Sequence, residues 1–584
     1  LFFFYLFNMI KYLKRGNDME KLIMVARGKE KADIVFKNAK VFNVFIGDFI
    51  IGDVAICGNV VAGIGNYKGE VEIDCTDKYI TPGFIDAHVH IESSMLSPGE
   101  FAKTIVPLGT TTVVADPHEI ANVAGLKGIQ YILEATEDLP LNVFVMLPSC
   151  VPATFLETSG AVLKAKDLKK LIKHKRVLGL GEMMNYPGVL NAAPEVLEKL
   201  ELFQQKIIDG HAPSLRGNDL MAYAAGGISS DHECSNAEEA FERLNAGMYV
   251  MLREGSAAKN LLNILPVVNR YTAQFCLLAT DDRHPADLLE LGHINNMIKI
   301  AIEAGADLST LLQMATINAA RYFKLDKIGA IAPGYKADML IFEDLQNWQP
   351  QSVYIDGKLV SENGRALFEK ELPKAQLNKK IILPELTADN LKIKATGTMA
   401  NVIELVPGEI ITKKLLVELD NTDGEFKIDL NQDLLKLVVV ERHNNTGNIG
   451  VALVKGFGLK KGAIASTVAH DSHNLIIVGT NDEDIIVAAQ EILRANGGIT
   501  VVAEGAVLNT LALNIGGLMA QTDVIAVKDK LTALRENTEK LGLNQDHDPF
   551  LTLAFLSLPV IPSLKLTDKG LVDVDEFQII TVAK

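Results

Sequence analysis

The chain has 584 residues, of which 48% are hydrophobic and 22% charged, a composition that indicates a globular protein of two to four domains. Its net charge is −16 and no run of Lys or Arg stands out, which disfavours a nucleic-acid-binding protein, since such a protein needs a basic face. The five scattered cysteines form no CxxC pair, which argues against disulfides and thiolate metal sites and fits a cytoplasmic location.

Residues 1–30 are predicted to be an N-terminal extension. Leu1–Phe7 is an apolar run that precedes three basic residues, the reverse of a signal peptide, and it is too short to span a bilayer. We interpret residues 1–18 as an upstream segment, with Met19 as the true start of the protein. An interfacial anchor is the alternative, and no other membrane association is expected.

Residues 31–80 and residues 329–384 share the pattern of short β-strands. Both alternate apolar and polar residues between Gly and Asn, as in GDVAICGNVVAGIG and SVYIDGKLV. Because the two stretches flank a long α/β region, we expect them to build one small β-sandwich domain together.

Residues 81–328 alternate between strands and helices. Eight short apolar runs are the strand candidates: GFIDAHVH, TTVVADPHE, NVFVMLPSC, RVLGLGEMM, KIIDGHAP, GISSDHE, MYVMLREGS and FCLLATDD. Parallel strands covered on both faces have this character. Helix-like segments follow several of them, at Pro98–Leu108, Val189–Lys206, Ala237–Ala246 and Ala286–Ala304. Eight such repeats predict an α/β fold of the TIM (β/α)8 barrel type.

Residues 385–584 are predicted to form a C-terminal α+β domain. Segments such as KLVVVERHNNTG and GGITVVAEG have the character of strands. Asn481 to Asn496 is predicted to be a helix, with Asn481 as its N-cap and Gly497 just beyond its end.

Metal-binding residue types stand at the carboxyl ends of the barrel strands, where barrels of this type build active sites. They are His88, His90, Glu182, His211, His232 and Asp281. His88 and His90 are two residues apart on one strand, so their side chains point to the same face. Several imidazoles with carboxylates suit Zn, Fe or Mn, and a bridging carboxylate would hold two ions that activate one water.

These residues resemble the amidohydrolase superfamily. The resemblance rests on PGFIDAHVH, on His211, His232 and Asp281, and on the returning segment GAIAPGYKADMLIF. It implies that the HxH pair and Asp281 bind one metal, that His211 and His232 bind the other, and that Asp281 shuttles a proton. Many members bridge the ions with a carbamylated Lys on strand four. Glu182 stands there in this chain, which counts against a dihydroorotase or dihydropyrimidinase.

A closer resemblance, from about Lys31 to the C-terminus, is to the bacterial and archaeal adenine deaminases. The matching stretches are HVHIESSMLSP, ADPHEIANVAG, GLGEMMNYPGV, DGHAP, SSDHE, MLREGSA, ATDDRHP and GFGLKKGAIASTVAHDSHN. The resemblance implies hydrolysis of adenine to hypoxanthine and ammonia in purine salvage. It also implies two divalent ions per subunit, Mn or Fe with Zn as a further option, and a homodimer.

On this resemblance, the catalytic residues are expected to be Asp281, Glu119 and His232. A metal-activated hydroxide would attack C6 of adenine, Asp281 would carry its proton to the leaving ammonia, and Glu119 would protonate a ring nitrogen. Substrate contacts are expected from the strand ends at His118, Glu119, Arg253, Glu254, Ser256 and His284. The alternative for Arg253 and Glu254 is that they pair only with other charges on the rim.

Three questions stay open from the sequence. His470, Asp471 and His473 in AHDSHN could form a further metal site, a lid over the barrel, or a loop ordered by its own hydrogen bonds, which is the favoured interpretation. The substrate could instead be a cyclic amide or an N-acyl compound. A non-catalytic scaffold is the rival from another class, and the six intact ligand positions argue against it.

Overall fold

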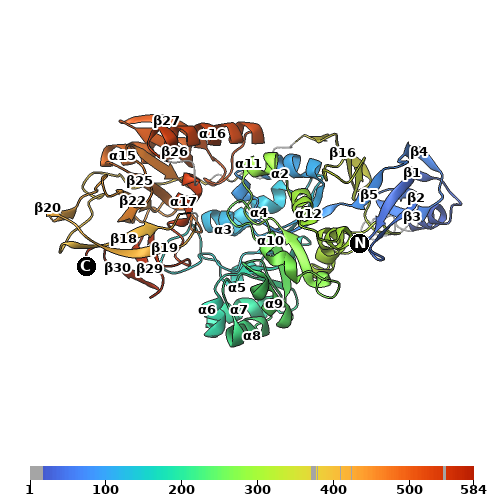
Figure 1. Cartoon of the computed structure of the whole chain (residues 1–584), viewed down its shortest axis with the longest axis horizontal. Coiled ribbons are helices and arrows are strands. Elements are labelled where there is room, and N and C mark those ends of the chain that lie inside the picture. Colours follow the sequence, from blue (N-terminus) through green and yellow to red (C-terminus); the bar gives the residue numbers. More distant parts are fainter. Residues whose placement is uncertain (1–17, 370–376, 378, 408, 423, 544–547) are drawn as a thin grey trace, which may run out of the picture.

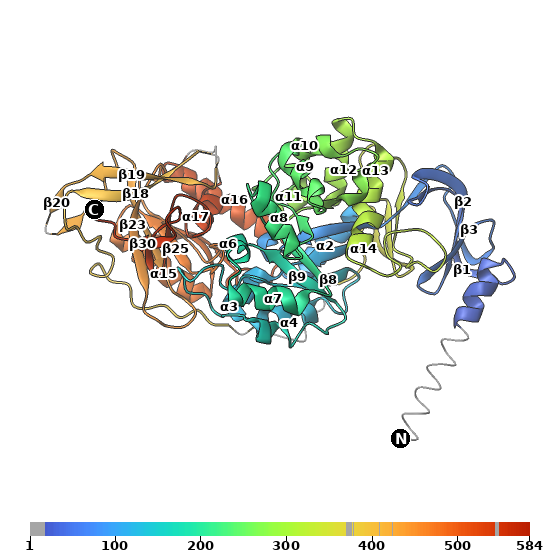
Figure 2. The same ribbon diagram turned by 90° about the horizontal axis from the view of Figure 1, so that it is seen from below.

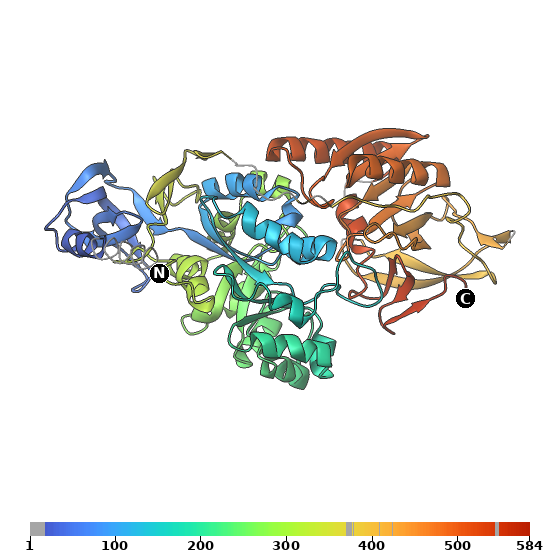
Figure 3. The same cartoon turned by 180° about the vertical axis from the view of Figure 1, so that it is seen from behind.

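The computed structural model describes residues 18–584 except 370–376, 378, 408, 423 and 544–547. Most of the expected N-terminal extension therefore lies outside the described residues. A sheet that includes the N-terminal strands, a barrel and a C-terminal sheet follow one another along the long axis, as Figures 1 and 3 show from opposite sides. Within the described part of the chain, no helix has the length and apolar character needed to cross a membrane.

Eight strands form the predicted barrel. They are β6 (Phe84–Val89), β7 (Thr110–Ala115), β8 (Asn142–Leu147), β9 (Val177–Met183), β10 (Ile207–Gly210), β11 (Ser230–Asp231), β12 (Tyr249–Arg253) and β13 (Cys276–Ala279). Strands β6 to β10 pair in parallel, and so do β11 to β13. A parallel bridge between Val89 and Asp281 joins the last strand to the first. A backbone hydrogen bond from Ser229 to Ile208 links β10 to β11. The TIM barrel prediction is confirmed.

Helices surround the barrel strands (Figure 2). They are α2 (Pro98–Ile105), α3 (His118–Ala124), α4 (Leu126–Ala135), α5 (Ala165–Leu168), α6 (Tyr186–Leu190), α7 (Pro194–Phe203), α8 (Gly217–Ala225), α9 (Ala237–Asn245), α10 (Leu261–Ile264), α11 (Pro285–Glu290), α12 (Ile294–Glu303), α13 (Leu308–Gln313) and α14 (Ala319–Tyr322). Two predicted helices are each broken in two. Ala192 has φ 50° and Pro194 begins α7, while Gly292 with φ 112° separates α11 from α12. A left-handed residue cannot continue a right-handed helix, which explains both breaks.

Strands from both flanks of the barrel join one sheet. They are β1 (Ala32–Asn43), β2 (Asp48–Cys57), β3 (Val60–Gly65), β4 (Gly69–Asp74), β5 (Tyr79–Pro82), β14 (Met339–Phe342), β15 (Ser352–Ile355), β16 (Lys358–Glu362) and β17 (Arg365–Ala366). β14 pairs antiparallel with β5, so that Leu340 lies opposite Thr81. Where a β-sandwich is expected, hydrogen bonds connect all these strands into one nine-stranded sheet. Alternating side chains such as Val54 and Ile56 supply a buried core on one face.

The C-terminal part of the chain is built on an eight-stranded sheet with the strand order β19-β18-β23-β22-β25-β24-β26-β27. These strands are β18 (Met399–Leu405), β19 (Thr412–Glu418), β22 (Leu434–Val440), β23 (Ile449–Lys455), β24 (Ala463–Ser466), β25 (Leu475–Gly479), β26 (Gly498–Ala503) and β27 (Ala506–Ala512). Smaller pairings are β20 (Asn421–Thr422) with β21 (Glu425–Phe426), and β28 (Leu564–Thr567), β29 (Gly570–Asp573) and β30 (Gln578–Ile580) together. The helices are α15 (Asp482–Ala495), α16 (Val524–Lys540) and α17 (Pro549–Phe555). The Asn481 side chain caps α15 as predicted, by accepting a hydrogen bond from the backbone of Asp484.

The C-terminal part is attached directly to the rim of the barrel. The backbone N–H of Ala520 donates to the carbonyl of Met95 at 2.8 Å, and Ser97 donates back to Ala520 at 3.2 Å. The Asn474 amide donates to the carbonyl of Thr158 at 2.8 Å. Helix α16 also packs against α2 and α11. The C-terminal part therefore lies over the end of the barrel where the predicted site residues are.

Candidate metal centre and active site

The six predicted metal ligands come together on the rim. His88 and Glu182 stand near the carboxyl ends of β6 and β9, whereas His211 and His232 directly follow β10 and β11. Asp281 follows β13, and its left-handed backbone, with φ 58°, turns the chain at this point. All six are buried except His211, which is partly exposed. Parallel strands ending on one rim thus bring residues distant in sequence to one centre.

Glu182 lies in the middle of four imidazoles. Its Oε1 is 3.2 Å from Nε2 of His90 and 3.2 Å from Nδ1 of His118. Its Oε2 is 2.7 Å from Nδ1 of His211 and 3.3 Å from Nε2 of His232. Each carboxylate oxygen therefore faces a different pair of rings, which is the arrangement that a carboxylate bridging two cations requires.

Asp281 closes the other side of the cluster. Its Oδ1 lies 3.1 Å from Nε2 of His90 and 3.7 Å from Nε2 of His88, and these two nitrogens are 3.1 Å apart. The Nδ1 of His90 lies 2.8 Å from the carbonyl oxygen of Asp116, so it carries the ring proton and the Nε2 lone pair faces the cluster. Lone pairs converging with two carboxylates fit a divalent cation.

The carboxylates and imidazoles of the cluster shift one another's pKa values. Although burial opposes it, hydrogen bonds to Asp281 and Glu182 raise the pKa of His90 well above its ordinary value, so a bound cation would take the place of a proton there. Burial, followed by the charges of His232 and His90, holds the pKa of His88 well below its ordinary value, which keeps a lone pair available. Burial alone would raise the pKa of Glu182, but hydrogen bonds from the surrounding imidazoles hold it well below its usual range. Burial is likewise outweighed at Asp281, where His90 and Arg253 hold the carboxyl pKa well below its ordinary value.

Asp116 supports the bridging carboxylate from behind. Its Oδ2 accepts a hydrogen bond from the backbone N–H of Glu182 at 3.0 Å, and its carbonyl orients His90. A Cβ atom at Gly181 would lie 1.9 Å from Asp116 Oδ2, so only glycine permits this approach. Groups behind metal ligands fix their orientation in this way.

Of the predicted substrate contacts, His118 and Glu119 lie closest to the cluster of predicted metal ligands. His118 and Glu119 begin α3; His118 joins the cluster beside Glu182, while Glu119 is 1% exposed and accepts from the Ser93 hydroxyl at 3.0 Å. Burial, then Asp282 and Glu92, raise the pKa of Glu119 to about 8.

Arg253 pairs with charges on the rim. Its Nη1 donates to Asp281 Oδ2 at 2.7 Å, and its Nη2 donates to Glu233 Oε2 at 3.1 Å. Glu254 is not brought into the cluster, because its carboxyl faces Arg283 and Lys259. Arg253 and Glu254 therefore both face other charged side chains.

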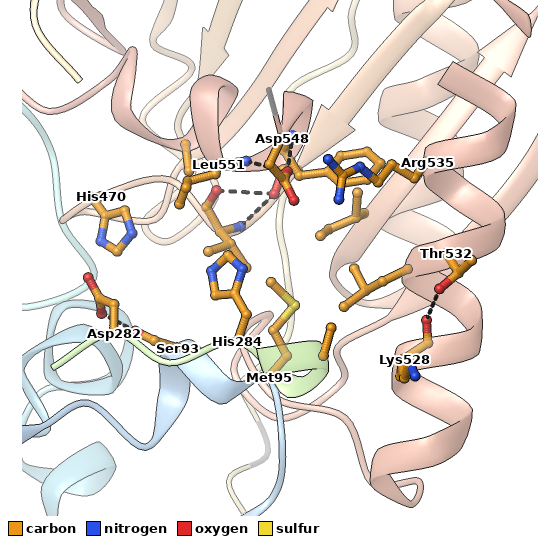
Figure 4. Close-up of a pocket in the computed structure, with 17 residues that line it drawn as sticks. Ser93, Met95, Asp282, His284, His470, Lys528, Thr532, Arg535, Asp548 and Leu551 are labelled. Atoms are coloured by element: carbon orange, nitrogen blue, oxygen red, sulfur yellow. Dashed lines mark hydrogen bonds between the residues drawn. The ribbon is translucent and has the colours of Figure 1, made fainter. Parts of the chain in front are cut away.

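A cavity of about 100 Å³ lies between the barrel rim and the C-terminal part (Figure 4). Ser93, Asp282 and His284 line it from the barrel. The Ser256 hydroxyl accepts from the backbone N–H of His284 at 2.8 Å, and it therefore positions this wall. From the C-terminal part, His470 and apolar side chains of α16 and α17 complete the lining. Because Ser93 also contacts Glu119, the cavity extends to the neighbourhood of Glu119.

The sequence reasoning missed several residues at this site. Glu233 lies 3.6 Å from His211 and 3.4 Å from His232, and it also pairs with Arg253. Its position directly after His232 in SSDHE was an available signal. Asp116 gave a similar signal, because in ADPHE it lies two residues before His118. No local signal brings His470 to the barrel, since that contact depends on tertiary structure.

The fold and the rim residues define a metal-dependent hydrolase of the amidohydrolase class, and the model of the Amidohydrolase family matches residues 79–360. The model of the Adenine deaminase C-terminal domain matches residues 409–578. The chain is 57% identical over 566 residues to Adenine deaminase 2 of Carboxydothermus hydrogenoformans, covering 97% of this chain and 99% of that protein. It is 48% identical to Adenine deaminase of Clostridium acetobutylicum, covering 96% and 100% respectively. The chain belongs to the adenine deaminase family.

A crystal structure of an adenine deaminase also aligns with this chain. The TM-score is 0.45 at 18% identity, and the alignment covers 57% of this chain and 100% of that one.

Proposed function

We propose that this chain hydrolyses adenine to hypoxanthine and ammonia, with two divalent ions at the rim of the barrel. Its near full-length similarity to proteins named adenine deaminase supports this substrate. The observation that carries the metal centre is the position of Glu182, whose two oxygens face different imidazole pairs.

The proposed ligands divide into two sets. His88, His90 and Asp281 would hold one ion, His211 and His232 the other, and Glu182 both. The neighbouring His118 is close enough to Glu182 Oε1 to act at the same centre. Manganese or iron is the proposed metal, with zinc as a further option, because imidazole and carboxylate donors accept all three. When bound, two ions would lower the pKa of a shared water so that hydroxide forms near neutral pH.

Two carboxyl groups would move the protons. Asp281 is ionised and held by Arg253, so it can accept a proton from the attacking water and pass it to the leaving amino group. Glu119 is buried with a raised pKa, and it can donate a proton to a ring nitrogen as C6 is attacked. His232 would contribute to catalysis by holding the second ion together with Glu182.

The remaining substrate contacts are assigned by position. His284 lines the cavity next to Asp282 and is proposed to contact the purine ring. Ser256 would act through His284. Arg253 is proposed to act through Asp281 rather than on the substrate, and Glu254 is given no contact, because it faces other charges.

We further propose a cytoplasmic homodimer acting in purine salvage. The segments 31–80 with 329–384, 81–328, and 385–584 are proposed as its folding domains. Light scattering on the purified protein would test the dimer, and limited proteolysis with mass mapping would test the boundaries.

The test of function is hydrolysis of adenine by Mn-loaded protein, followed by ultraviolet absorbance, for wild type and Asp281→Asn. We expect hypoxanthine from the wild type and a loss of about 10²- to 10⁴-fold in kcat for the variant, as for removal of a general acid-base group. A protein that binds two ions but does not turn over adenine would contradict the substrate. A panel of cyclic amides and N-acyl compounds would then be assayed.

A further inference from the structure

A segment of the C-terminal part, His470–His473 between β24 and β25, reaches the active site at two points. His470 Nδ1 lies 3.5 Å from Oε1 of Glu119. Asp471 Oδ1 lies 3.9 Å from Nε2 of His118. Both residues are almost fully buried. Of the three interpretations that the sequence left open, this position favours a segment that closes over the barrel.

His470 is held firmly by its own part of the chain. Its ring stacks on Phe555, with centroids 4.7 Å apart and an interplanar angle of 20°. Its backbone N–H donates to the carbonyl of Ala554 at 3.1 Å, and the Ser557 hydroxyl donates to its carbonyl at 3.3 Å. The same ring lines the cavity, where Figure 4 shows it near Asp282. His470 therefore joins Glu119 to the cavity.

His473 fits poorly as a metal ligand beside His470. Its Nδ1 accepts a hydrogen bond from the backbone N–H of Ala469 at 3.2 Å, so its ring proton is on Nε2. That Nε2 is buried and has no hydrogen-bond partner among the described residues. A nitrogen that carries a proton cannot bind a cation, although Glu119, His470 and His473 approach closely enough for a metal site. A role in proton transfer fits His470 better.

The proposed reaction requires Glu119 to regain one proton in every turnover. Adenine and water give hypoxanthine and ammonia, so both protons of the water end in the products. Asp281 passes one to the leaving nitrogen, and Glu119 supplies the ring nitrogen from its own carboxyl group. The proton lost when water becomes hydroxide must then be returned to Glu119, whose side chain is cut off from bulk solvent.

We propose that His470 returns this proton to Glu119, so that the C-terminal part supplies a proton relay to the barrel. The ring accepts on Nε2 the proton that the attacking water releases to the water of the cavity, and it gives the Nδ1 proton to Glu119 Oε1. The neutral ring then returns to its starting tautomer by exchanging protons with the water of the cavity, which leaves no net change in its proton count. No electrons are transferred, and the proton balances the one released on ionisation of the attacking water. His470 acts through Glu119 and is in this sense a positioning residue. The inference rests on the proposed acid role of Glu119.

The groups around His470 are compatible with this role. Glu119 faces it from α3, Asp282 from the loop after β13, and Asp471 from its own segment. The rings of His118 and His473 also lie nearby, and when protonated they carry a positive charge that disfavours a second positive charge on His470. Burial, the largest influence, lowers the pKa of His470 even though Asp282 and Asp471 oppose it. Ser93, the other contact of Glu119, also bonds to Asp282 and orients the carboxyl group.

The experiment compares full-length, metal-loaded wild type with His470→Gly and His470→Gln at saturating adenine. Glutamine keeps hydrogen-bonding groups but cannot carry a proton, whereas the glycine variant leaves room for added imidazole. We expect both variants to lower kcat about 10²-fold, with KM changed less than about threefold. Imidazole should restore His470→Gly at least tenfold and leave His470→Gln unchanged. His174→Gln is the matched control, because His174 precedes β9 at the end of the barrel opposite to the predicted site, and it should keep wild-type kcat.

Glu119→Gln separates the two proposals. If it is inactive while His470→Gln keeps full kcat, the relay is wrong and the acid role of Glu119 stands. If Glu119→Gln itself keeps full kcat, the proposed acid is wrong and the relay fails with it. A change confined to KM in the His470 variants, or the absence of imidazole rescue in a folded His470→Gly with normal metal content, would also overturn the relay.

Discussion

Arg253 holds Asp281 in place, because its Nη1 donates to the carboxylate Oδ2 at 2.7 Å while Oδ1 stays turned toward His90. The two carboxylate oxygens thus have separate partners, one the guanidinium of Arg253 and the other the histidines of the proposed metal centre. Glu233 shares the same guanidinium and also approaches His211. A single arginine therefore links the proton-transfer group to the ligands of the second proposed ion.

Replacement of Arg253 by Gln should lower kcat by about 10²-fold or more, because Asp281 would lose both its orientation and its counter-charge. Leaving the buried Asp281 and the partly buried Glu233 without their cation should also destabilise the fold by about 3–5 kcal/mol. Kinetics with adenine and thermal unfolding would measure both effects. Arg216→Gln is the control, because Arg216 pairs with Glu238 on the surface. Unchanged kcat in Arg253→Gln would show that Asp281 does not need this partner.

Glu182→Gln should lose bound metal. An amide offers one neutral oxygen in place of two charged ones, and the bridge between the two imidazole pairs would be broken. We expect fewer than two ions per chain after dialysis, measured by inductively coupled plasma mass spectrometry. Retention of two ions at wild-type affinity would contradict the bridging role. Glu238→Gln, a change at an exposed carboxyl, should bind metal normally.

The barrel and its ligands could be predicted because both leave local signals. A strand end carrying HxH, Glu or Asp can be recognised without knowing its neighbours, and the barrel topology then brings these ends together. The two helix breaks did leave local signals, because Pro194 and Gly292 lie within the predicted helices, whereas Ala192 carries no signature of its left-handed backbone. The approach of His470 to Glu119 depends on how the C-terminal part lies over the rim, which no periodicity encodes. The hydrogen bond from Arg253 to Asp281 likewise joins two strand ends and can be seen only in the folded structure.

Glu157 should make the protein less stable as pH rises. Burial, followed by repulsion from Asp471, raises its pKa from 4.5 to about 8, although a hydrogen bond from Ser472 opposes the shift. Between these two pH values the native state keeps a proton that the unfolded chain releases, so stability falls through this window. The slope from one such group is at most about 1.4 kcal/mol per pH unit.

Glu157→Gln should therefore flatten the fall in melting temperature between pH 5 and pH 8, most visibly at pH 8, where the wild type must ionise a buried carboxyl. Thermal unfolding at fixed ionic strength would measure the difference. Glu198→Gln, at an exposed position of α7, should leave the profile unchanged. An identical pH profile for Glu157→Gln and wild type would mean that Glu157 is ionised in the native state.

Gly181→Ala tests whether the backbone beside Glu182 sets metal affinity. The added Cβ would lie 1.9 Å from Asp116 Oδ2, so either Asp116 or strand β9 must move. Asp116 holds the backbone N–H of Glu182 and the ring of His90, so its displacement would misalign both ligands. Changes behind metal ligands typically cost about 10- to 100-fold in metal affinity, which is the loss we expect from a metal titration.

The control for Gly181→Ala is Gly65→Ala, whose Cβ would meet only Tyr67 Cε2, at an ordinary contact distance of 3.4 Å. It should leave metal affinity and kcat unchanged. Because the wild-type ligands all remain in Gly181→Ala, excess metal should restore most of its kcat if only affinity is lowered. Wild-type affinity in Gly181→Ala would show that Asp116 can move without disturbing Glu182, and that the bridging carboxylate is oriented by the imidazoles alone.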